Sequence, residues 1–258
     1  MSHPKTDPKA DRKIYIRKLD LPKLLAKKSH FLFGPRSTGK TTLIESQLQE
    51  ALVYDLLDDS IYHTLLRNPS QIEQENKSAQ KIIVIDEIQK LPKLLDEVHR
   101  LIKKHQWTFL LTGSSARKLK TGSENLLGGR AWEAKLFPLV SQEINNFELI
   151  KYLNRGGLPF VYDSNYFEQE LKSYIHLYLR EEVLQEGLVK KYEHFLNFLD
   201  VIGLCNGQEL NFERLASDAQ VPSRTIINYL QILEDTLLGF QLYPFRKTKN
   251  RKAVSKSK

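Results

Sequence analysis

Short apolar runs recur along the first half of the chain and alternate with stretches of helical periodicity. Such runs, bounded by polar residues, are typical of strands buried on both faces of a parallel sheet. They lie at residues 30–33, 52–57, 82–85 and 107–111. Apolar residues between 91 and 104 recur every three to four positions, which predicts a helix. Strands alternating with helices predict an α/β fold, with a parallel sheet that helices cover on both faces.

The alternation ends after Lys135, and the pattern from residue 137 to 204 is mostly helical. A Gly-Gly-Leu-Pro sequence at residues 156–159 predicts a turn within this region. The sequence therefore predicts a helical region that follows the sheet.

A winged helix-turn-helix layout is predicted further along the chain. Its expected parts are two short helices at 212–216 and 225–233, a turn at 220–223 and a wing strand at 237–243. Arg224 and Asn228 would be the exposed contacts of the second helix with DNA. That helix is not notably basic, and Glu234 and Asp235 lie at its end, so docking of a protein is the alternative.

The segment after the first expected strand matches the phosphate-binding pattern G-x-x-x-x-G-K-[ST]. Its residues are Gly34, Pro35, Arg36, Ser37, Thr38, Gly39, Lys40 and Thr41, and Thr42 continues into a helix. The glycines let successive N–H groups converge on phosphate oxygens, and the helix directs its positive end to the same place. We expect these nine residues to bind ATP, with Lys40 on the β- and γ-phosphates and Thr41 on Mg²⁺. For Arg36, a side chain facing solvent is an equal alternative.

An Asp-Glu pair, Asp86 and Glu87, directly follows the third expected strand. Ligands of parallel sheets bind at the carboxyl ends of the strands. Asp86 is therefore expected to hold Mg²⁺ through water, and Glu87 to orient and deprotonate an attacking water. Two solvated surface carboxylates are the alternative, and the P-loop upstream favours the catalytic interpretation.

The fourth expected strand ends in a small polar cluster at residues 112–116. At the same edge of the sheet, Ser114 or Thr112 could contact the γ-phosphate through the bound water. The alternative is an N-cap for a helix expected at residues 115–119, and one residue can do both.

Four segments in this order resemble a family of bacterial and archaeal AAA+-type P-loop ATPases with a C-terminal domain of unknown function. They are GPRSTGKTTL, IIVIDEIQKLP, LLTGSSARKL and GGRAWEAKLFPLVSQEI. The resemblance covers residues 15–247 or so. It implies an additional-strand P-loop core, a catalytic glutamate at Glu87 and a polar sensor at Ser114. It also draws attention to Arg130 as a trans-acting arginine finger or sensor, which would neutralise charge in the transition state.

The resemblance also implies a further nuclease-like module after residue 245, and no such module follows here. We therefore expect either a truncated chain or one that works without this module, and no nuclease activity is carried over.

Composition and charge add limits to this interpretation. The net charge is +8, and the segment 246–258 holds seven basic residues and no acidic one, so the basicity belongs to this tail. A solvated, disordered tail and a non-specific contact with phosphate backbones are the two alternatives. Cys205 is the single cysteine, which excludes an internal disulfide or a cysteine metal cluster and fits a cytoplasmic protein. Neither a secretory signal nor an apolar run of membrane-spanning length is present, so no membrane is expected.

These observations predict an ATPase that uses ATP and Mg²⁺. The expected parts are an N-terminal segment (1–29), a P-loop core (30–140), a helical region (141–205), a winged helix (206–245) and a basic tail (246–258). A DNA- or protein-binding regulator that uses ATP as a switch or structural ligand is the alternative, and a homo-oligomer is compatible with both. No Asn-Lys-x-Asp base-specificity motif is present, which favours ATP over GTP.

Overall fold

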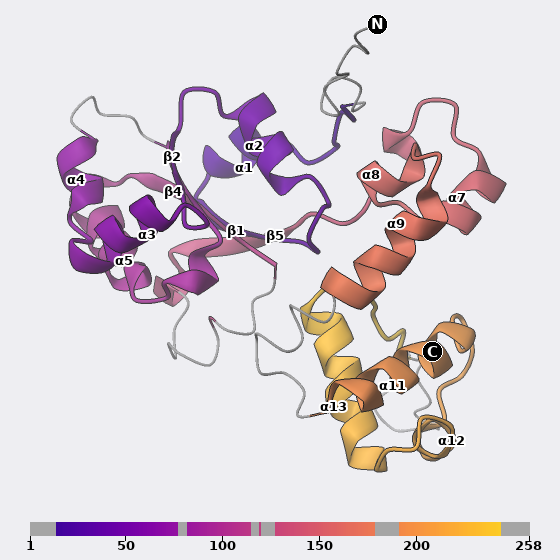
Figure 1. The fold of residues 1–258 in the computed structure, drawn as a ribbon. Helices are drawn as coiled ribbons and strands as arrows, with labels where there is room; N and C mark the ends of the chain where they lie inside the picture. The colour runs from indigo at the N-terminus through magenta and orange to yellow at the C-terminus, as the bar shows by residue number, and fades with distance from the viewer. Residues whose placement is uncertain (1–13, 77–81, 115–118, 120–126, 179–190, 244–258) are drawn as a thin grey trace, which may run out of the picture. The chain divides into compact units, whose positions relative to one another are not determined.

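The chain divides into two units, Met1–Lys172 and Ser173–Lys258. The computed structural model describes residues 14–76, 82–114, 119, 127–178 and 191–243 (Figure 1). The first unit contains a parallel sheet with helices, and the second contains helices around their own apolar cluster.

Five strands form the sheet, in the order β2-β3-β4-β1-β5, and each neighbouring pair is parallel. They are β1 (Ser29–Phe33), β2 (Leu52–Asp55), β3 (Ile82–Asp86), β4 (Thr108–Gly113) and β5 (Ala131–Lys135). The four predicted strands are confirmed, and β5 is a fifth that the apolar runs did not predict. Because all strands run the same way, their carboxyl ends lie along one edge of the sheet.

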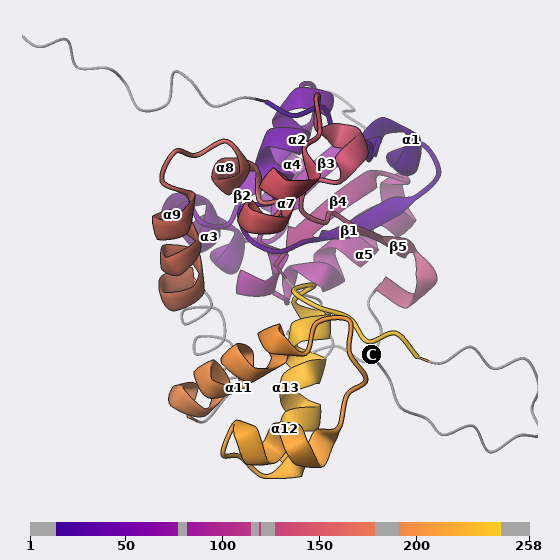
Figure 2. The same ribbon diagram turned by 90° about the vertical axis from the view of Figure 1, so that its right-hand side faces the viewer.

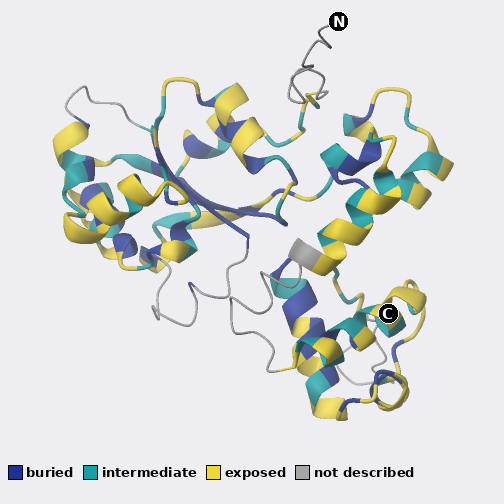
Figure 3. Ribbon diagram, viewed as in Figure 1, coloured by how far each residue is buried: buried dark blue, intermediate teal, exposed yellow. Residues whose placement is uncertain are grey.

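Burial on both faces accounts for the apolar runs of the central strands, whereas the edge strand β2 carries such a run although only its Tyr54 is buried. Figure 3 shows the buried residues running along the central strands, and β1 is buried at every position. In contrast, β5 is an edge strand, with Trp132 and Glu133 exposed and only Ala134 buried. A strand with one covered neighbour does not need a continuous apolar run.

Helices cover both faces of the sheet, and Figure 2 shows α2 and α5 on opposite sides of it. The helices around it are α1 (Leu21–Leu25), α2 (Lys40–Gln47), α3 (Asp59–Arg67), α4 (Gln71–Glu75) and α5 (Leu94–His105), with a 3₁₀ turn η1 (Ile88–Lys90) after β3. Buried apolar side chains of α1 and α2 pack against Leu32, Val84 and Leu110 on one face of the sheet. The helix predicted from residue 91 begins at Leu94 instead, because the residue before Pro92 is disfavoured in a helix.

Short helices follow the sheet, as the pattern predicts. They are a 3₁₀ turn, η3 (Ser141–Glu143), then α7 (Leu149–Arg155), α8 (Pro159–Tyr162), α9 (Phe167–Ser173) and a π-helical turn, η4 (Tyr174–Tyr178). A further 3₁₀ turn, η2 (Leu127–Gly129), precedes β5. The predicted turn is present between α7 and α8, where Gly156 ends α7 at a φ of 70° that favours glycine.

The second unit begins with η4, and its other described helices are α11 (Tyr192–Leu204), α12 (Phe212–Asp218) and α13 (Ser223–Asp235). Phe195 and Phe198 of α11 pack against Tyr229 of α13 in its apolar cluster. Asn211 caps α12 by accepting from two main-chain N–H groups. The two helices predicted in this region are confirmed as α12 and α13, and Arg224 and Asn228 of α13 are exposed.

The expected wing strand at residues 237–243 is not formed, since these residues contain no strand. Leu237 instead adopts a left-handed φ of 59°, and its N–H donates to the carbonyl of Glu234. The N–H of Leu238 donates to the carbonyl of Leu233 at 2.9 Å. These two bonds form a Schellman cap, so the apolar residues of this segment end α13 rather than start a strand.

Candidate functional site

The P-loop connects the carboxyl end of β1 to the start of α2, as predicted. Gly39 precedes the helix with a φ of 89°, which strains any other residue type. Gly34 is required for a different reason: a Cβ there would lie 2.4 Å from the carbonyl oxygen of Leu136. The sequence therefore places a glycine at each end of the loop where a side chain would not fit.

The ammonium group of Lys40 turns back over the loop. Its Nζ donates to the carbonyl of Gly34 at 2.7 Å and to that of Pro35 at 3.2 Å. Lys40 is buried, and a buried ammonium is costly unless oxygen atoms surround it. The loop thus holds a positive charge among its own carbonyl groups.

The other loop residues contribute mainly through the main chain. Thr38 is fully buried and donates its hydroxyl to the carbonyl of Pro35 at 2.7 Å, which closes the turn from inside. Ser37 is exposed at a left-handed φ of 60°, Arg36 is half-buried, and Thr42 is exposed on α2. The positions of these three side chains do not indicate a contact with a phosphate.

A chain of hydrogen bonds joins the P-loop helix to the ends of β3 and β4. The hydroxyl of Thr41 donates to Oδ2 of Asp86 at 3.3 Å, and the hydroxyl of Thr112 donates to Oδ1 of the same carboxylate. The main-chain N–H of Glu87 in turn donates to Thr112 Oγ1 at 3.2 Å. Asp86 is buried, so these donors compensate for its loss of water.

Oxygen donors of this kind suit Mg²⁺. The hydroxyl of Thr41 and the carboxylate of Asp86 are hard oxygen ligands, and Mg²⁺ is usually bound by one or two such groups together with waters and phosphates. The residues present therefore fit the metal that the sequence predicts.

Glu87 lies directly after β3 in a left-handed conformation, with a φ of 57°. Its Oε2 accepts a hydrogen bond from the side-chain amide of Gln89. Gln89 is close to the end of β4 as well, because a Cβ on Gly113 would lie 2.6 Å from its Oε1. The carboxylate of Glu87 is therefore oriented by a residue two positions further along the chain.

Ser114 follows β4 at the same edge and is 2% exposed. Within the described part of the chain, neither its hydroxyl nor Oε1 of Gln89 has a hydrogen-bond partner. A buried polar atom without a partner is costly and marks a place where a ligand or water binds. The helix expected at residues 115–119 lies outside the described residues except for Leu119.

Arg130 is the predicted site residue that the structure does not bring to this edge. It directly precedes β5, whose first residue, Ala131, pairs with Ser29 at the start of β1. Arg130 is thus at the amino edge of the sheet, whereas the P-loop follows the carboxyl edge. The length of a five-residue strand, about 16 Å, separates the two edges.

Three residues at this site were not predicted as site residues or were left as alternatives. Thr112 was the alternative to Ser114 as a contact of the γ-phosphate. Its hydroxyl group forms hydrogen bonds with both the carboxylate of Asp86 and the main-chain N–H of Glu87. Gln89 lies within the segment IIVIDEIQKLP, two residues after Glu87, and this proximity was the available signal. Arg17, which donates to the carbonyl of Thr38 at 2.6 Å, lies before the first expected strand in a segment without a recognisable motif.

Comparison with known proteins divides the chain into two domains. Residues 26–145 match a family model described as an AAA domain, and residues 146–258 match one described as a domain of unknown function, DUF8612. The expected AAA-type domain and the expected C-terminal domain of unknown function are thereby confirmed.

Among curated proteins, an uncharacterized protein of Methanocaldococcus jannaschii is 24% identical over 83% of this chain and 56% of its own length. This chain therefore spans about half of that relative. Among solved structures, domain III of the Thermotoga maritima replication initiation protein DnaA has 15% identity, a TM-score of 0.35 and coverage of 61% of this chain and 78% of its own. The Aeropyrum pernix ORC2 protein has 14% identity, a TM-score of 0.34 and coverage of 92% and 86%. We draw no functional conclusion from structural similarity at this level.

Within the described ranges, no helix is both long enough and apolar enough to cross a membrane.

Proposed function

Since the chain contains an AAA domain that continues into a domain of unknown function, we propose that it binds ATP with Mg²⁺ and hydrolyses it. Lys40 would hold the β- and γ-phosphates, Thr41 and Asp86 the metal, and Glu87 the attacking water. Main-chain N–H groups of residues 34–42 would surround the phosphates. The products would be ADP and inorganic phosphate.

One observation carries this proposal. The hydroxyls of Thr41 and Thr112 both donate to the buried carboxylate of Asp86, and Glu87 is tied to the same Thr112. A phosphate-binding helix, a metal-binding carboxylate and a candidate base are thus linked within one hydrogen-bonded chain. Buried polar groups arranged in this way are costly for stability alone, so they support a chemical role.

The chemistry expected of these residues follows from their positions. Lys40 would exchange its bonds to the loop carbonyls for phosphate oxygens. Glu87 would accept the proton of the attacking water on a carboxylate oxygen, and Ser114 would donate to the γ-phosphate or to that water. Mg²⁺, when bound, neutralises charge shared by the β- and γ-phosphate oxygens.

For Arg130, a role in the active site of its own chain is not supported, because it lies at the opposite edge of the sheet. A role in trans, at the site of a second copy, is compatible with that position. It would stabilise transition-state charge there, which requires a homo-oligomer.

A switch function is the second candidate. Oε2 of Glu87 is occupied by the amide of Gln89, and a carboxylate held in this way is restrained from reaching a water. ATP would then act as a ligand that changes the protein's binding to DNA or to another protein. Arg224 and Asn228 on the exposed side of α13 are the groups through which the helix-turn-helix would make such contacts.

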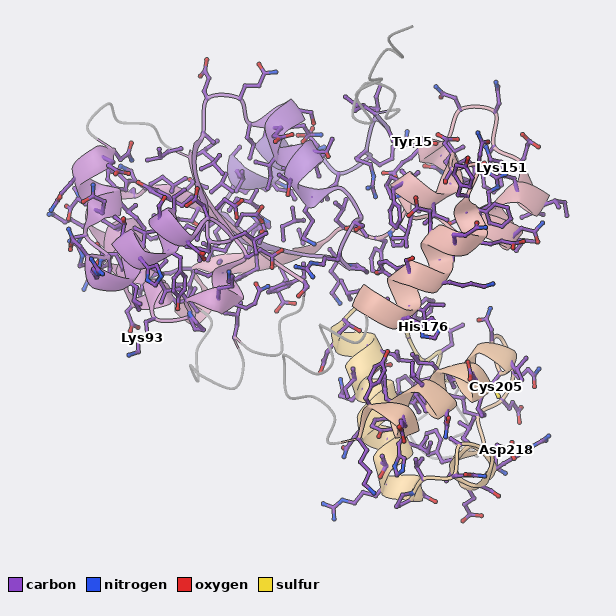
Figure 4. All side chains as sticks on the ribbon, viewed as in Figure 1. Tyr15, Lys93, Lys151, His176, Cys205 and Asp218 are labelled. Atoms are coloured by element: carbon purple, nitrogen blue, oxygen red, sulfur yellow. The ribbon has the colours of Figure 1, made fainter. Side chains whose placement is uncertain are left out.

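The site is tested by ATP binding to the full chain and to Lys40→Ala. We expect the variant to bind ATP at least about a hundredfold more weakly, because it loses charge-assisted hydrogen bonds to two phosphates. Lys93→Ala is the charge-matched control: Lys93 is exposed at the start of α5, is labelled in Figure 4, and should leave binding unchanged. Equal ATP affinity of Lys40→Ala and the unchanged protein would rule out this site.

A further inference from the structure

Arg17 contacts the P-loop from outside the phosphate-binding motif. Its Nη1 donates to the carbonyl of Thr38 at 2.6 Å, and its Nη2 donates to the carbonyl of Phe137 at 2.5 Å. Its Nε lies 3.1 Å from Oε2 of Glu143 in an ion pair. The side chains of this pair are 7% and 4% exposed, so water screens the interaction little. One guanidinium group thus joins three segments that are far apart in the sequence.

The carboxylate of Glu143 has further donors. Its Oε1 accepts from the main-chain N–H of Lys18 at 2.7 Å, and its Oε2 accepts from that of Val140 at 3.2 Å. A buried ion pair is favourable where its remaining hydrogen-bonding capacity is used. Both Nη atoms of Arg17 and both oxygens of Glu143 have hydrogen-bond partners, whereas Nε of Arg17 contacts Glu143 as an ion pair without hydrogen-bond geometry. The pair is therefore an ordered cross-link rather than a chance surface contact.

The bond to Thr38 affects the phosphate-binding main chain directly. A trans peptide unit is planar, so the carbonyl of Thr38 and the N–H of Gly39 point in opposite directions. Because Arg17 holds that carbonyl on its own side, the N–H of Gly39 is directed to the other side of the loop. A Cβ on Gly39 would lie only 3.9 Å from Nη1 of Arg17, which shows how closely the guanidinium lies behind this peptide unit.

The segment that follows β5 contacts the other end of the loop. The N–H of Leu136 donates to the carbonyl of Phe33 at 2.8 Å, and the Leu136 carbonyl lies against Gly34. Residues 136–143 therefore touch the start of the loop directly and its end through Arg17. These residues lead into the region matched by the domain of unknown function.

Tyr15 extends this connection to α8. Its hydroxyl donates to Asp163, which also forms an ion pair with Lys151 at 3.3 Å. Burial and the nearby Asp163 raise the pKa of the Tyr15 hydroxyl above its ordinary value. Figure 4 shows Tyr15 and Lys151 beside the helices α7 and α8.

We propose that Arg17 is a positioning residue for nucleotide binding, which orients the peptide unit before Lys40 and links it to residues 136–143. The proposal rests on the ATP site proposed above and adds to it that phosphate affinity depends on a segment outside the motif. Through Tyr15, the same N-terminal segment connects the P-loop to the start of the C-terminal region.

The test is steady-state ATP hydrolysis by the full chain and by Arg17→Lys. A lysine keeps the charge beside Glu143, but its single nitrogen cannot donate to both carbonyls in the geometry of the guanidinium. We expect KM for ATP to rise at least about tenfold, the effect of losing one charge-assisted hydrogen bond, while kcat stays within about twofold. Lys18→Ala is the control, since Lys18 contacts Glu143 through its main chain only and its side chain is exposed.

Glu143→Gln is the second variant, for the case in which Arg17→Lys does not fold. It keeps the shape of the side chain, removes the charge opposite Arg17, and should raise KM by a smaller factor. An unchanged KM in either folded variant, or a lower kcat at unchanged KM, would overturn the role of Arg17. Weak ATP binding by Lys40→Ala would then still support the site itself, whereas no ATP binding by the unchanged protein would overturn both proposals.

Discussion

The two units of the chain differ in what they bury. Five buried polar residues in the first unit gather at one edge of the sheet: Thr38, Lys40, Asp86, Thr112 and Ser114. Among the described residues of the second unit, only Thr236 is polar and buried, and its hydroxyl donates to the carbonyl of Ile232 within its own helix. The core of the second unit is otherwise apolar and aromatic.

This difference is the physical reason for assigning the proposed chemistry to the first unit. Buried hydroxyls, carboxylates and ammonium groups reduce stability unless partners satisfy them, so their concentration at one edge supports a function there. The second unit contains no such arrangement in its described residues, and its exposed α13 face supports a role in binding. Changes in one unit should therefore affect activity, and changes in the other should affect stability.

Phe195→Ala should produce the largest effect on stability. Phe195 is fully buried against Tyr229, and removing a buried phenylalanine side chain costs about 3–5 kcal/mol. Thermal or denaturant unfolding should show this loss for the transition of the second unit. Phe240→Ala is the control because Phe240 is exposed. ATP affinity should stay within about twofold in both variants, and a large loss of affinity in Phe195→Ala would show that the units are not independent.

Ser114→Ala should lower activity without lowering stability, the opposite of Phe195→Ala. The hydroxyl has no partner among the described residues, so its removal should leave the nucleotide-free protein equally stable or stabilise it by about 1 kcal/mol. Turnover of ATP should nevertheless fall about tenfold, which corresponds to one lost hydrogen bond in the transition state. Ser217→Ala, an exposed serine of α12, is the matched control. Unchanged turnover in Ser114→Ala would leave this serine without a role in hydrolysis.

Gln89→Ala should give the smallest effect. The amide of Gln89 orients Glu87, and loss of one such bond, about 1 kcal/mol, should lower kcat about fivefold without changing ATP affinity. The measurement is steady-state hydrolysis at saturating ATP. A higher kcat would mean that Gln89 restrains Glu87, and it would favour the switch function over continuous turnover.

The sequence predicted the sheet and its carboxyl edge well because both depend on local patterns. Buried parallel strands require apolar runs, and the P-loop requires glycines at Gly34 and Gly39, where the structure allows no Cβ or strains one. The AAA-type family followed from the same segments. These features are encoded within a few consecutive residues.

Features that depend on distant residues were not predictable. Arg17 is important only because Phe137 and Glu143 approach it in the fold, and β5 is an edge strand without a continuous apolar run. The apolar segment at residues 237–243 suggested a wing strand, yet the main-chain N–H groups of Leu237 and Leu238 cap α13. Hydrophobicity does not distinguish a short strand from a helix cap.

The most direct test of the account is phosphate release from ATP by the full chain and by Glu87→Gln, with and without duplex DNA. The variant keeps the shape of the side chain but cannot accept a proton from water at neutral pH. We predict that it binds ATP as tightly as the unchanged protein and hydrolyses it about 10²–10⁴ times more slowly. Stimulation by DNA would connect the helix-turn-helix to the ATP site. Equal turnover by both proteins would contradict the assignment of Glu87 and the hydrolytic function proposed for this site.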